Sequence, residues 1–292
     1  MTIFSKLRTY GSLVAIAHTV FALPFAATAV ILALGVSHPP VGAARLLGML
    51  VCMVCARTSA MAFNRWADRD IDAKNPRTRG RHVPRGIVKA SEALWLAVVA
   101  GAAFLVAAAL MGFWTGVLAP PVLAILLGYS FAKRFTWGAH AWLGVALALA
   151  PGGAWVAMGA RPQLGIVLLM VAVASWLLGF DVLYSLQDEQ FDRDARLASI
   201  PARFGARRAL GMSALAHALT VVALASCGLV LHRGAAYGVG VATAAALLVY
   251  EHTLVRTRGL AAIDKAFFDV NAWVSIAFFG LVALDELLRR TA

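Results

Sequence analysis

The sequence predicts an all-α polytopic membrane protein, a bundle of about nine transmembrane helices with two long cytoplasmic loops after helices 2 and 6. Three observations support this fold class. Of the 292 residues, 61% are hydrophobic and 14% are charged, whereas roughly half of a soluble domain is apolar. The apolar residues form runs long enough to cross a bilayer. The charged residues gather between those runs.

The apolar runs define the expected helices, each near the roughly 20 residues that cross the hydrocarbon core of a bilayer. The first run follows ten polar and basic residues and is itself long enough to span, so we expect no cleavable signal peptide. The third and fourth runs are separated by almost nothing, which predicts a tight hairpin. In chain order the runs are Leu13–Leu34, Arg45–Phe63, Ala93–Gly112, Trp114–Phe131, Ala139–Met158, Leu164–Tyr184, Ala209–Leu231, Ala235–Val255 and Phe267–Leu288.

The positive charges are distributed unevenly among the loops. When the loops are assigned alternately to the two sides of the membrane, twenty Lys and Arg fall on one side, five fall on the other, and Arg57 lies within a span. Loops rich in Lys and Arg face the cytoplasm. We therefore expect both long loops there, in a multi-pass protein of the cell inner (plasma) membrane. The net charge of +12 then reflects topology, and we expect no nucleic-acid partner.

Regularly spaced acidic residues begin both long loops. In the first loop, Asn64, Asp68 and Asp72 stand four residues apart, which places them on one face of a helix. Asp188 and Asp192 repeat the spacing in the second loop. Clusters that offer only carboxylates suit Mg²⁺, which takes one or two carboxylates together with water and substrate phosphates. No His stands at ligand spacing, which disfavours Zn²⁺. The expected metal ligands are therefore the four aspartates.

Basic and amide side chains beside the acidic faces are candidates for binding a diphosphate, because they can neutralise and hydrogen-bond its oxygens. The alternative is that they only set the membrane topology, which we prefer for Arg85, Lys89 and the Arg207–Arg208 pair. The expected diphosphate ligands are Asn64, Arg77, Arg81, Lys133 and Arg134, with Arg79 as a further candidate.

Two ionisable residues lie deeper in the apolar runs, below the acidic faces. Arg57 is seven residues before Asn64 and Asp181 is seven before Asp188, so each lies two helical turns from its motif. Such groups cost about 2.5–3.5 kcal/mol to insert into a membrane and are usually functional. Arg57 and Asp181 either pair with each other or line a polar cavity. In that cavity Arg57 would meet an anionic or carbonyl group of an acceptor, and Asp181 and Tyr184 would border the reacting carbon. All three are expected to be catalytic residues.

A polar site at the cytoplasmic surface of an apolar bundle suits a long isoprenoid diphosphate, whose tail can lie among apolar side chains and membrane lipid. Mg²⁺ and the basic residues would stabilise the departing diphosphate. An electron-rich ring would then attack the allylic carbocation. A transporter of an anionic lipid or phosphate compound is the alternative from a different class. It is disfavoured because the acids gather at one membrane face rather than at the midplane.

The chain is expected to form a single transmembrane domain over residues 1–292. Both long loops carry acids, then bases, then a proline (Pro84 and Pro201). This recurrence indicates a weak internal repeat, roughly 11–134 and 139–255, followed by a final helix. Such repeats commonly place a site at their mutual interface.

Four motifs in one order resemble those of a known family. They are Asn64-x-x-x-Asp68-x-x-x-Asp72, preceded by Arg57; Arg77-Thr78-x-x-Arg81-x-x-Pro84; Tyr129-x-x-x-Lys133-Arg134; and Asp188-x-x-x-Asp192, preceded by Asp181 and Tyr184. The chain resembles, over nearly its whole length, the UbiA family of intramembrane aromatic prenyltransferases. The resemblance implies nine helices, two Mg²⁺ ions on the cytoplasmic side, and transfer of a polyprenyl group from a polyprenyl diphosphate to a small aromatic acceptor in ubiquinone or menaquinone biosynthesis.

The acceptor stays open at this point. His18–Pro24 and Ala266–Asn271 resemble the bacterial branch that uses 4-hydroxybenzoate, which makes a 4-hydroxybenzoate-type acceptor the first expectation. A futalosine-type or dihydroxynaphthoate acceptor of menaquinone biosynthesis is the alternative. His18 could contact the acceptor, or it could be a packed, hydrogen-bonded histidine.

Overall fold

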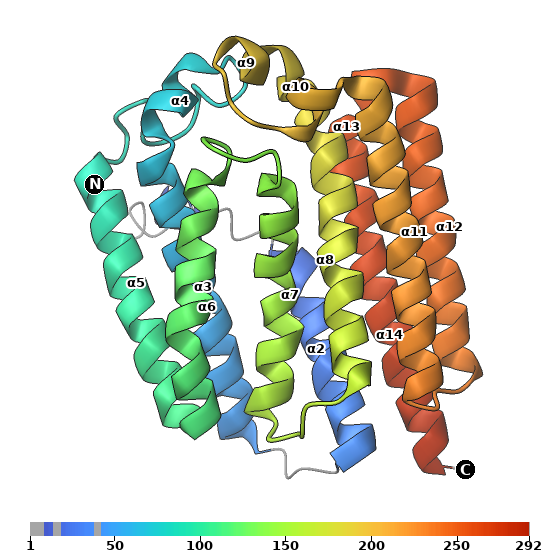
Figure 1. The fold of residues 1–292 in the computed structure, drawn as a ribbon. Helices are drawn as coiled ribbons and strands as arrows, with labels where there is room; N and C mark the ends of the chain where they lie inside the picture. The colour runs from blue at the N-terminus through green and yellow to red at the C-terminus, as the bar shows by residue number, and fades with distance from the viewer. Residues whose placement is uncertain (1–8, 14–18, 38–41, 292) are drawn as a thin grey trace. The chain divides into compact units, whose positions relative to one another are not determined.

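The computed structural model describes residues 9–13, 19–37 and 42–291, and within them it contains helices and no strands (Figure 1). Among these residues, eight helices are long and apolar enough to cross a membrane, and a shorter apolar helix covers Phe21–Ser37. The predicted all-α membrane bundle is therefore confirmed. The first expected span, Leu13–Leu34, falls partly outside the described residues, which place α2 at Thr19–Ser37.

The chain divides into two compact units, and the first comprises Met1–Thr19 and Val41–Phe131. Helices α3 and α5 pack against each other. Ser59 of α3 donates a hydrogen bond to the Ala97 carbonyl of α5, with an Oγ–O distance of 2.8 Å. Interfaces of this kind favour small residues, which let helix backbones approach closely. The helices that contribute to this unit are α3 (Ala43–Ala67), α4 (Arg69–Lys74), α5 (Ala90–Met111) and α6 (Phe113–Ala132).

The hairpin between α5 and α6 turns at Gly112 alone, which confirms the expected tight connection. Gly112 has a φ of 153°, a value that residues with a side chain rarely adopt. Further along α6, a Cβ on Gly116 would lie 3.1 Å from the Cα of Ala109. Glycine at both positions therefore allows the two helices to reverse direction and remain in contact.

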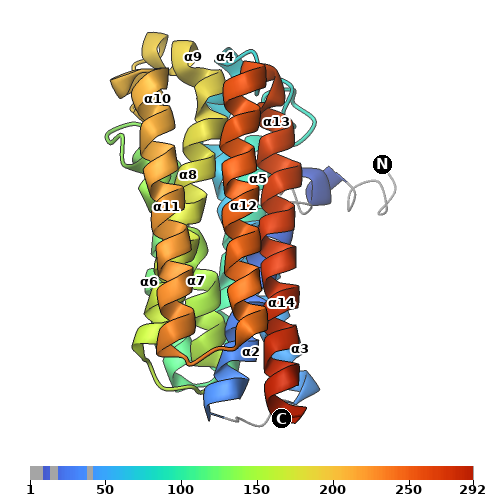
Figure 2. The same ribbon diagram turned by 90° about the vertical axis from the view of Figure 1, so that its right-hand side faces the viewer.

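The second unit comprises Val20–Pro40 and Ala132–Ala292. Within it, α8 packs against α7 and α11, and α12 packs against α11 and α14 (Figures 1 and 2). Its elements after α2 are α7 (Ala139–Ala157), α8 (Leu164–Ser185), η2 (Leu186–Asp188), α9 (Glu189–Asp194), α10 (Ile200–Phe204), α11 (Ala206–Val230), α12 (Ala235–Arg258), η3 (Gly259–Ala262), α13 (Ile263–Lys265), η4 (Ala266–Val270) and α14 (Asn271–Thr291).

Two glycines set the close packing around α8. A Cβ on Gly144 of α7 would collide with the Ala174 carbonyl oxygen of α8. A Cβ on Gly179 of α8 would collide with the imidazole of His217 on α11. Because α8 also carries Asp181 near its C-terminal end, these contacts fix the helix that bears a predicted site residue.

Candidate functional site

The first acidic motif lies where α3 gives way to the short helix α4. Asp68 stands between them with φ −93° and ψ 3°, in a sparsely populated region of backbone conformation. The expected single helix is therefore interrupted at Asp68. The helical hydrogen bonds nevertheless continue, because the Asp68 amide donates to the Asn64 carbonyl (2.9 Å) and the Asp72 amide donates to the Asp68 carbonyl (2.7 Å). The four-residue spacing that the sequence indicates is preserved across the break.

The second acidic motif has the same local structure. Helix α8 ends at Ser185, the turn η2 follows, and α9 begins at Glu189. Asp188 has φ −101° and ψ 2°, close to the values of Asp68. In both motifs the first aspartate stands at a junction, and the second lies buried in a six-residue helix. This shared conformation agrees with the proposed internal repeat, which as a whole stays a prediction.

Polar contacts within the first unit join the first motif to the segment that follows it. The Asn64 amide donates to Asp68 Oδ2 (2.8 Å). Arg81 Nη1 lies 2.7 and 2.8 Å from the two carboxylate oxygens of Asp72, which is only 4% exposed. Thr78 Oγ1 donates to the Asp72 carbonyl (3.1 Å). The basic segment therefore folds back onto the second aspartate of the motif.

Two predicted arginines of the first unit take different positions. Arg57 is half-buried on α3, the same helix that carries Asn64, so the expected two-turn relation holds. The side chain of Arg77 is exposed, and its backbone amide donates to Asn75 Oδ1 (2.9 Å). The roles expected for both residues stay predictions.

The second unit pairs its acidic motif with a base that directly follows α6. Lys133 Nζ lies 4.0 Å from Asp192 Oδ2, and the Ala198 amide donates to the Lys133 carbonyl (2.8 Å). Asp188 and Asp192 are 4% and 2% exposed. Asp192 Oδ2 is buried and accepts no hydrogen bond from any residue that the structure describes. Arg134, the residue after Lys133, is exposed.

Asp181 pairs with a residue that the sequence interpretation missed. His140, on the first turn of α7, lies with Nδ1 2.7 Å from Asp181 Oδ2. His140 is fully buried, and the Asp181 side chain is 18% exposed. A signal was present, because His140 is a titratable residue inside an apolar run, the criterion that selected Arg57 and Asp181. The sequence could not show the pairing itself, since the two residues are 41 positions apart.

Tyr184 lies at the edge of an aromatic cluster in the second unit. Its ring lies 4.2 Å from that of Phe267, centroid to centroid, at an interplanar angle of 34°. Phe267 also contacts Phe180 at 5.2 Å and Phe21 at 5.6 Å. Aromatic faces attract cations, so a cluster of this kind suits the neighbourhood of a carbocation. His18, which is a candidate for contact with the acceptor, lies outside the described residues.

The residues present fit a hard divalent cation by their chemistry. All four aspartates offer only oxygen atoms, which Mg²⁺ prefers, and one buried oxygen, Asp192 Oδ2, accepts no hydrogen bond within the described chain. Among residues 9–13, 19–37 and 42–291, no three His, Cys, Asp or Glu side chains lie close enough together to hold one ion. Instead Asp72 pairs with Arg81 and Asp192 with Lys133, each within its own unit.

The first long loop also contains a histidine with a lowered pKa. His82 Nε2 lies 2.9 Å from Ser12 Oγ. Partial burial lowers the pKa of His82, and the positive charges of Arg65 and Arg85 lower it further. A neutral His82 adds no further positive charge to a loop that already carries many arginines.

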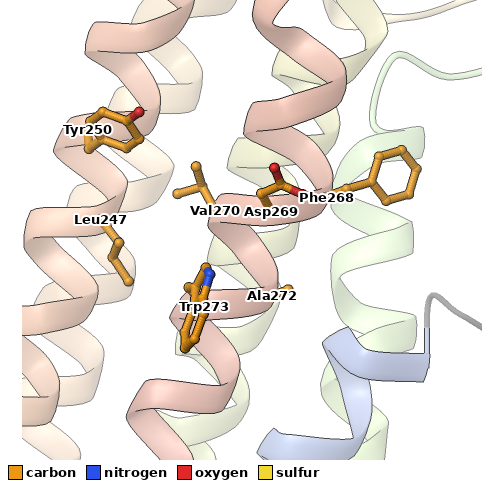
Figure 3. A pocket seen from close by; sticks show the side chains of 7 residues that line it. All are labelled: Leu247, Tyr250, Phe268, Asp269, Val270, Ala272 and Trp273. Carbon is orange, nitrogen blue, oxygen red and sulfur yellow. The ribbon is translucent and has the colours of Figure 1, made fainter.

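A groove of about 420 Å³ lies on the surface of the second unit. Its lining residues are distant in sequence from the four aspartates of the acidic motifs. Leu247 and Tyr250 come from α12, and the other lining residues come from η4 and α14 (Figure 3). The indole of Trp273 and the ring of Tyr250 are largely exposed. The groove includes none of the residues that the sequence analysis assigned to the site.

Comparison with known proteins identifies the family. The model of the UbiA prenyltransferase family matches residues 22–279. The chain belongs to this family. Its relatives include the 4-hydroxybenzoate octaprenyltransferases of Nitrosospira multiformis, 31% identical over 84% of this chain and 83% of the relative, and of Azoarcus sp., 32% identical over 80% and 81%.

Solved structures of UbiA homologs share the fold. A homolog from Aeropyrum pernix K1 has a TM-score of 0.83 and 32% sequence identity, and the match covers 92% of this chain and 98% of that one. A homolog from Archaeoglobus fulgidus bound to GPP and Mg²⁺ has a TM-score of 0.69 at 20% identity. The resemblance seen in the sequence is therefore confirmed: this UbiA-family protein is a multi-pass membrane enzyme that transfers prenyl groups. Membership also favours an enzyme over the transporter alternative.

Proposed function

We propose that this protein transfers a polyprenyl group from an allylic polyprenyl diphosphate to a 4-hydroxybenzoate-type quinone precursor in ubiquinone biosynthesis. One observation carries the proposal: two acidic motifs fold alike, and each buries its second aspartate beside a basic side chain. The names of the relatives, 4-hydroxybenzoate octaprenyltransferases at 31% and 32% identity, support the acceptor class.

The aspartates are proposed to hold Mg²⁺, as two ions that bridge the substrate diphosphate. The carboxylate-only donor set supports this, as does a relative with the same fold that was solved with GPP and Mg²⁺. When bound, Mg²⁺ would neutralise the charge that develops on the departing diphosphate. The proposed metal ligands are Asp68, Asp72, Asp188 and Asp192.

The basic residues and one amide are proposed to bind the diphosphate oxygens. Arg81 uses Nη1 toward Asp72, and a guanidinium has five N–H donors, so the same side chain can also donate to a phosphate. Lys133, beside Asp192, can also bind a phosphate, because its ammonium is a compact positive charge. The full proposed set is Asn64, Arg77, Arg81, Lys133 and Arg134.

The reaction breaks the bond between the allylic carbon and the diphosphate oxygen, and the electron pair leaves with the diphosphate. A ring carbon of the acceptor forms the new carbon–carbon bond, and the ring then loses a proton. We assign Asp181 and Tyr184 to the border of the reacting carbon, where a carboxylate and an aromatic face stabilise positive charge. Arg57 is assigned to an anionic or carbonyl group of the acceptor.

The site is proposed to face the cytoplasm, in the cell inner membrane. Twenty Lys and Arg on the side of both acidic loops, against five on the other, support this orientation. The prenyl tail would lie among apolar side chains and membrane lipid. On the described helices many apolar side chains, such as Leu110 and Leu215, are largely exposed, as lipid-facing positions require.

An acceptor panel tests the proposal directly. Purified protein would be incubated with one radiolabelled polyprenyl diphosphate, Mg²⁺ and, separately, 4-hydroxybenzoate, dihydroxynaphthoate or a futalosine analogue. We expect a prenylated product and released pyrophosphate with 4-hydroxybenzoate, and neither once EDTA is added. Product with dihydroxynaphthoate or the futalosine analogue instead would assign the protein to menaquinone biosynthesis. Transfer that persists in EDTA would contradict the Mg²⁺ assignment.

A further inference from the structure

His140 makes two polar contacts, and the proposed mechanism gives neither of them a role. Its Nδ1 lies 2.7 Å from Asp181 Oδ2 on α8. On the other edge of the ring, the backbone amide of Ile200 donates to Nε2 at 3.3 Å. The imidazole is fully buried. A buried ring with both nitrogens engaged is held in one orientation.

The two contacts determine where the ring proton lies. A backbone amide can only donate, so Nε2 must present its lone pair to Ile200. The proton of a neutral imidazole is then on Nδ1, where it faces Asp181 Oδ2. His140 is thus a hydrogen-bond donor to one oxygen of the carboxylate, Asp181 Oδ2.

The Ile200 contact extends this link to the second acidic motif. Ile200 begins α10, directly after Ser199, whose hydroxyl accepts a hydrogen bond from the Ala202 amide (3.4 Å). The same short loop returns to the motif through the Leu197 amide, which donates to the Asp192 carbonyl (2.7 Å). One imidazole therefore connects α8, where Asp181 lies, to the loop that follows Asp192.

We propose that His140 is a positioning residue for prenyl transfer, which holds the Asp181 carboxylate in its reactive orientation and joins it to the loop that carries the second acidic motif. The proposal rests on the proposed function, because it gives Asp181 its role beside the reacting carbon. Its physical basis is that a reacting group displaced by about 1 Å can lose about 100-fold in rate. If the His140–Asp181 pair served only to pack α7 against α8, replacing His140 would not change the chemical step through Asp181.

Two amide substitutions separate the contacts of His140. In His140→Asn the amide nitrogen takes the place of Nδ1 and can still donate to Asp181. In His140→Gln the amide oxygen takes the place of Nε2 and can still accept from Ile200. We expect His140→Ala to lower kcat about 10- to 100-fold, with the KM for prenyl diphosphate changed by less than about twofold. His140→Asn should recover more of kcat than His140→Gln, and the reverse order would overturn the proposal.

A double-substitution cycle tests whether His140 acts through Asp181. If it does, His140→Ala should cost little further rate once Asp181→Ala is present, because residues that act as one unit are not additive. Equal fold losses in the wild-type and Asp181→Ala backgrounds would show a role independent of Asp181 and overturn the proposal. His252→Ala is the matched control, since it also removes a buried imidazole of the second unit, one that contacts His217 and not Asp181.

The possible failures are distinguishable. A wild-type protein that prenylates no acceptor of the panel overturns the proposed function. An active wild type with an unimpaired Asp181→Ala variant overturns the role of Asp181 and, with it, that of His140. An impaired Asp181→Ala beside an unimpaired His140→Ala overturns the His140 proposal alone. Nitrogen-15 spectra of labelled histidine give a readout besides activity: the His140 signals should show a protonated Nδ1 that changes in Asp181→Ala, and an unchanged spectrum would contradict the contact.

Discussion

At the residue scale, Asp68 and Asp188 share a backbone conformation, and each directly precedes a six-residue helix. Both lie at a helix junction with nearly equal dihedral angles. Residues in this sparsely populated region often belong to active sites. The position, rather than the charge alone, therefore distinguishes these two aspartates from other acidic residues of the same loops.

Replacing Asp68 or Asp188 with alanine should abolish prenyl transfer and leave membrane insertion intact. Removing one carboxylate would weaken the binding of Mg²⁺, the ion proposed to neutralise the diphosphate charge. We therefore expect the rate to fall by about 100-fold or more. Product formation and the amount of protein in washed membranes would be measured together. Asp70→Ala is the matched control, because Asp70 lies two residues after Asp68 but its side chain is 79% exposed. Turnover near the wild-type rate in Asp68→Ala would refute its assignment as a metal ligand.

Arg57→Ala should impair use of the acceptor more than binding of the diphosphate. A charged hydrogen bond contributes about 1.5–3 kcal/mol, so we expect the acceptor KM to rise tenfold or more while the KM for prenyl diphosphate changes little. Arg161→Ala, which removes an exposed arginine between α7 and α8, serves as the control. Steady-state kinetics with each substrate varied in turn would decide. An unchanged acceptor KM would exclude this role for Arg57.

Regular spacing made the aspartates predictable from sequence, whereas partners distant in the chain were not. Asn64, Asp68 and Asp72 were recognisable because a helix brings every fourth residue to one side. Arg81 was predicted as a phosphate ligand, but its bond to Asp72 depends on the loop folding back. The His140–Asp181 pair depends on how α7 packs against α8, which a local pattern does not encode.

At the scale of elements, the long helices follow from the apolar runs, and the short ones do not. A run of about 20 apolar residues indicates a span whatever its neighbours are. The six-residue helices α4 and α9 are polar and contain the acidic motifs, so no apolar period marks them. No apolar period marks the π-helical turn η4 at Ala266–Val270 either, although this stretch resembles the bacterial branch that uses 4-hydroxybenzoate.

Asn271 stabilises that turn and two neighbouring helices, so Asn271→Ala should destabilise the second unit. The Asn271 amide nitrogen donates to Glu251 Oε1 (2.7 Å) and to the Ala266 carbonyl (3.1 Å), and Trp176 Nε1 donates to its oxygen (2.7 Å). Buried polar groups left without partners cost about 1–3 kcal/mol each. We expect a clearly lower Tm in detergent.

The exposed amide of Gln190 provides the control for Asn271. Gln190 Nε2 donates to Asp194 at 3.0 Å on an exposed surface, where water replaces a lost bond, so Gln190→Ala should leave the Tm within about 1 °C. A similarly small change in Asn271→Ala would show that the network of Asn271, Glu251 and Trp176 contributes little to stability.

At the scale of the whole molecule, the sequence determines membrane crossing and orientation more strongly than it determines the assembly of the site. Eight described helices can span by length and composition, and the uneven distribution of Lys and Arg predicts which loops face the cytoplasm. The two acidic motifs belong to different units of the chain. The sequence indicates a relation between the two motifs only through the recurrence of their spacing.

Orientation can be tested with single cysteines in a variant that lacks the three native ones, Cys52, Cys55 and Cys227. Arg79→Cys places a thiol on an exposed position of the first long loop, and Arg161→Cys places one on an exposed position that is expected on the opposite side. A membrane-impermeant maleimide should label position 79 in inverted vesicles and position 161 in right-side-out cells. The basic loops are expected inside because moving many positive charges across the membrane is unfavourable. Labelling of position 79 from outside would place the diphosphate site away from the cytoplasm and contradict the proposed orientation.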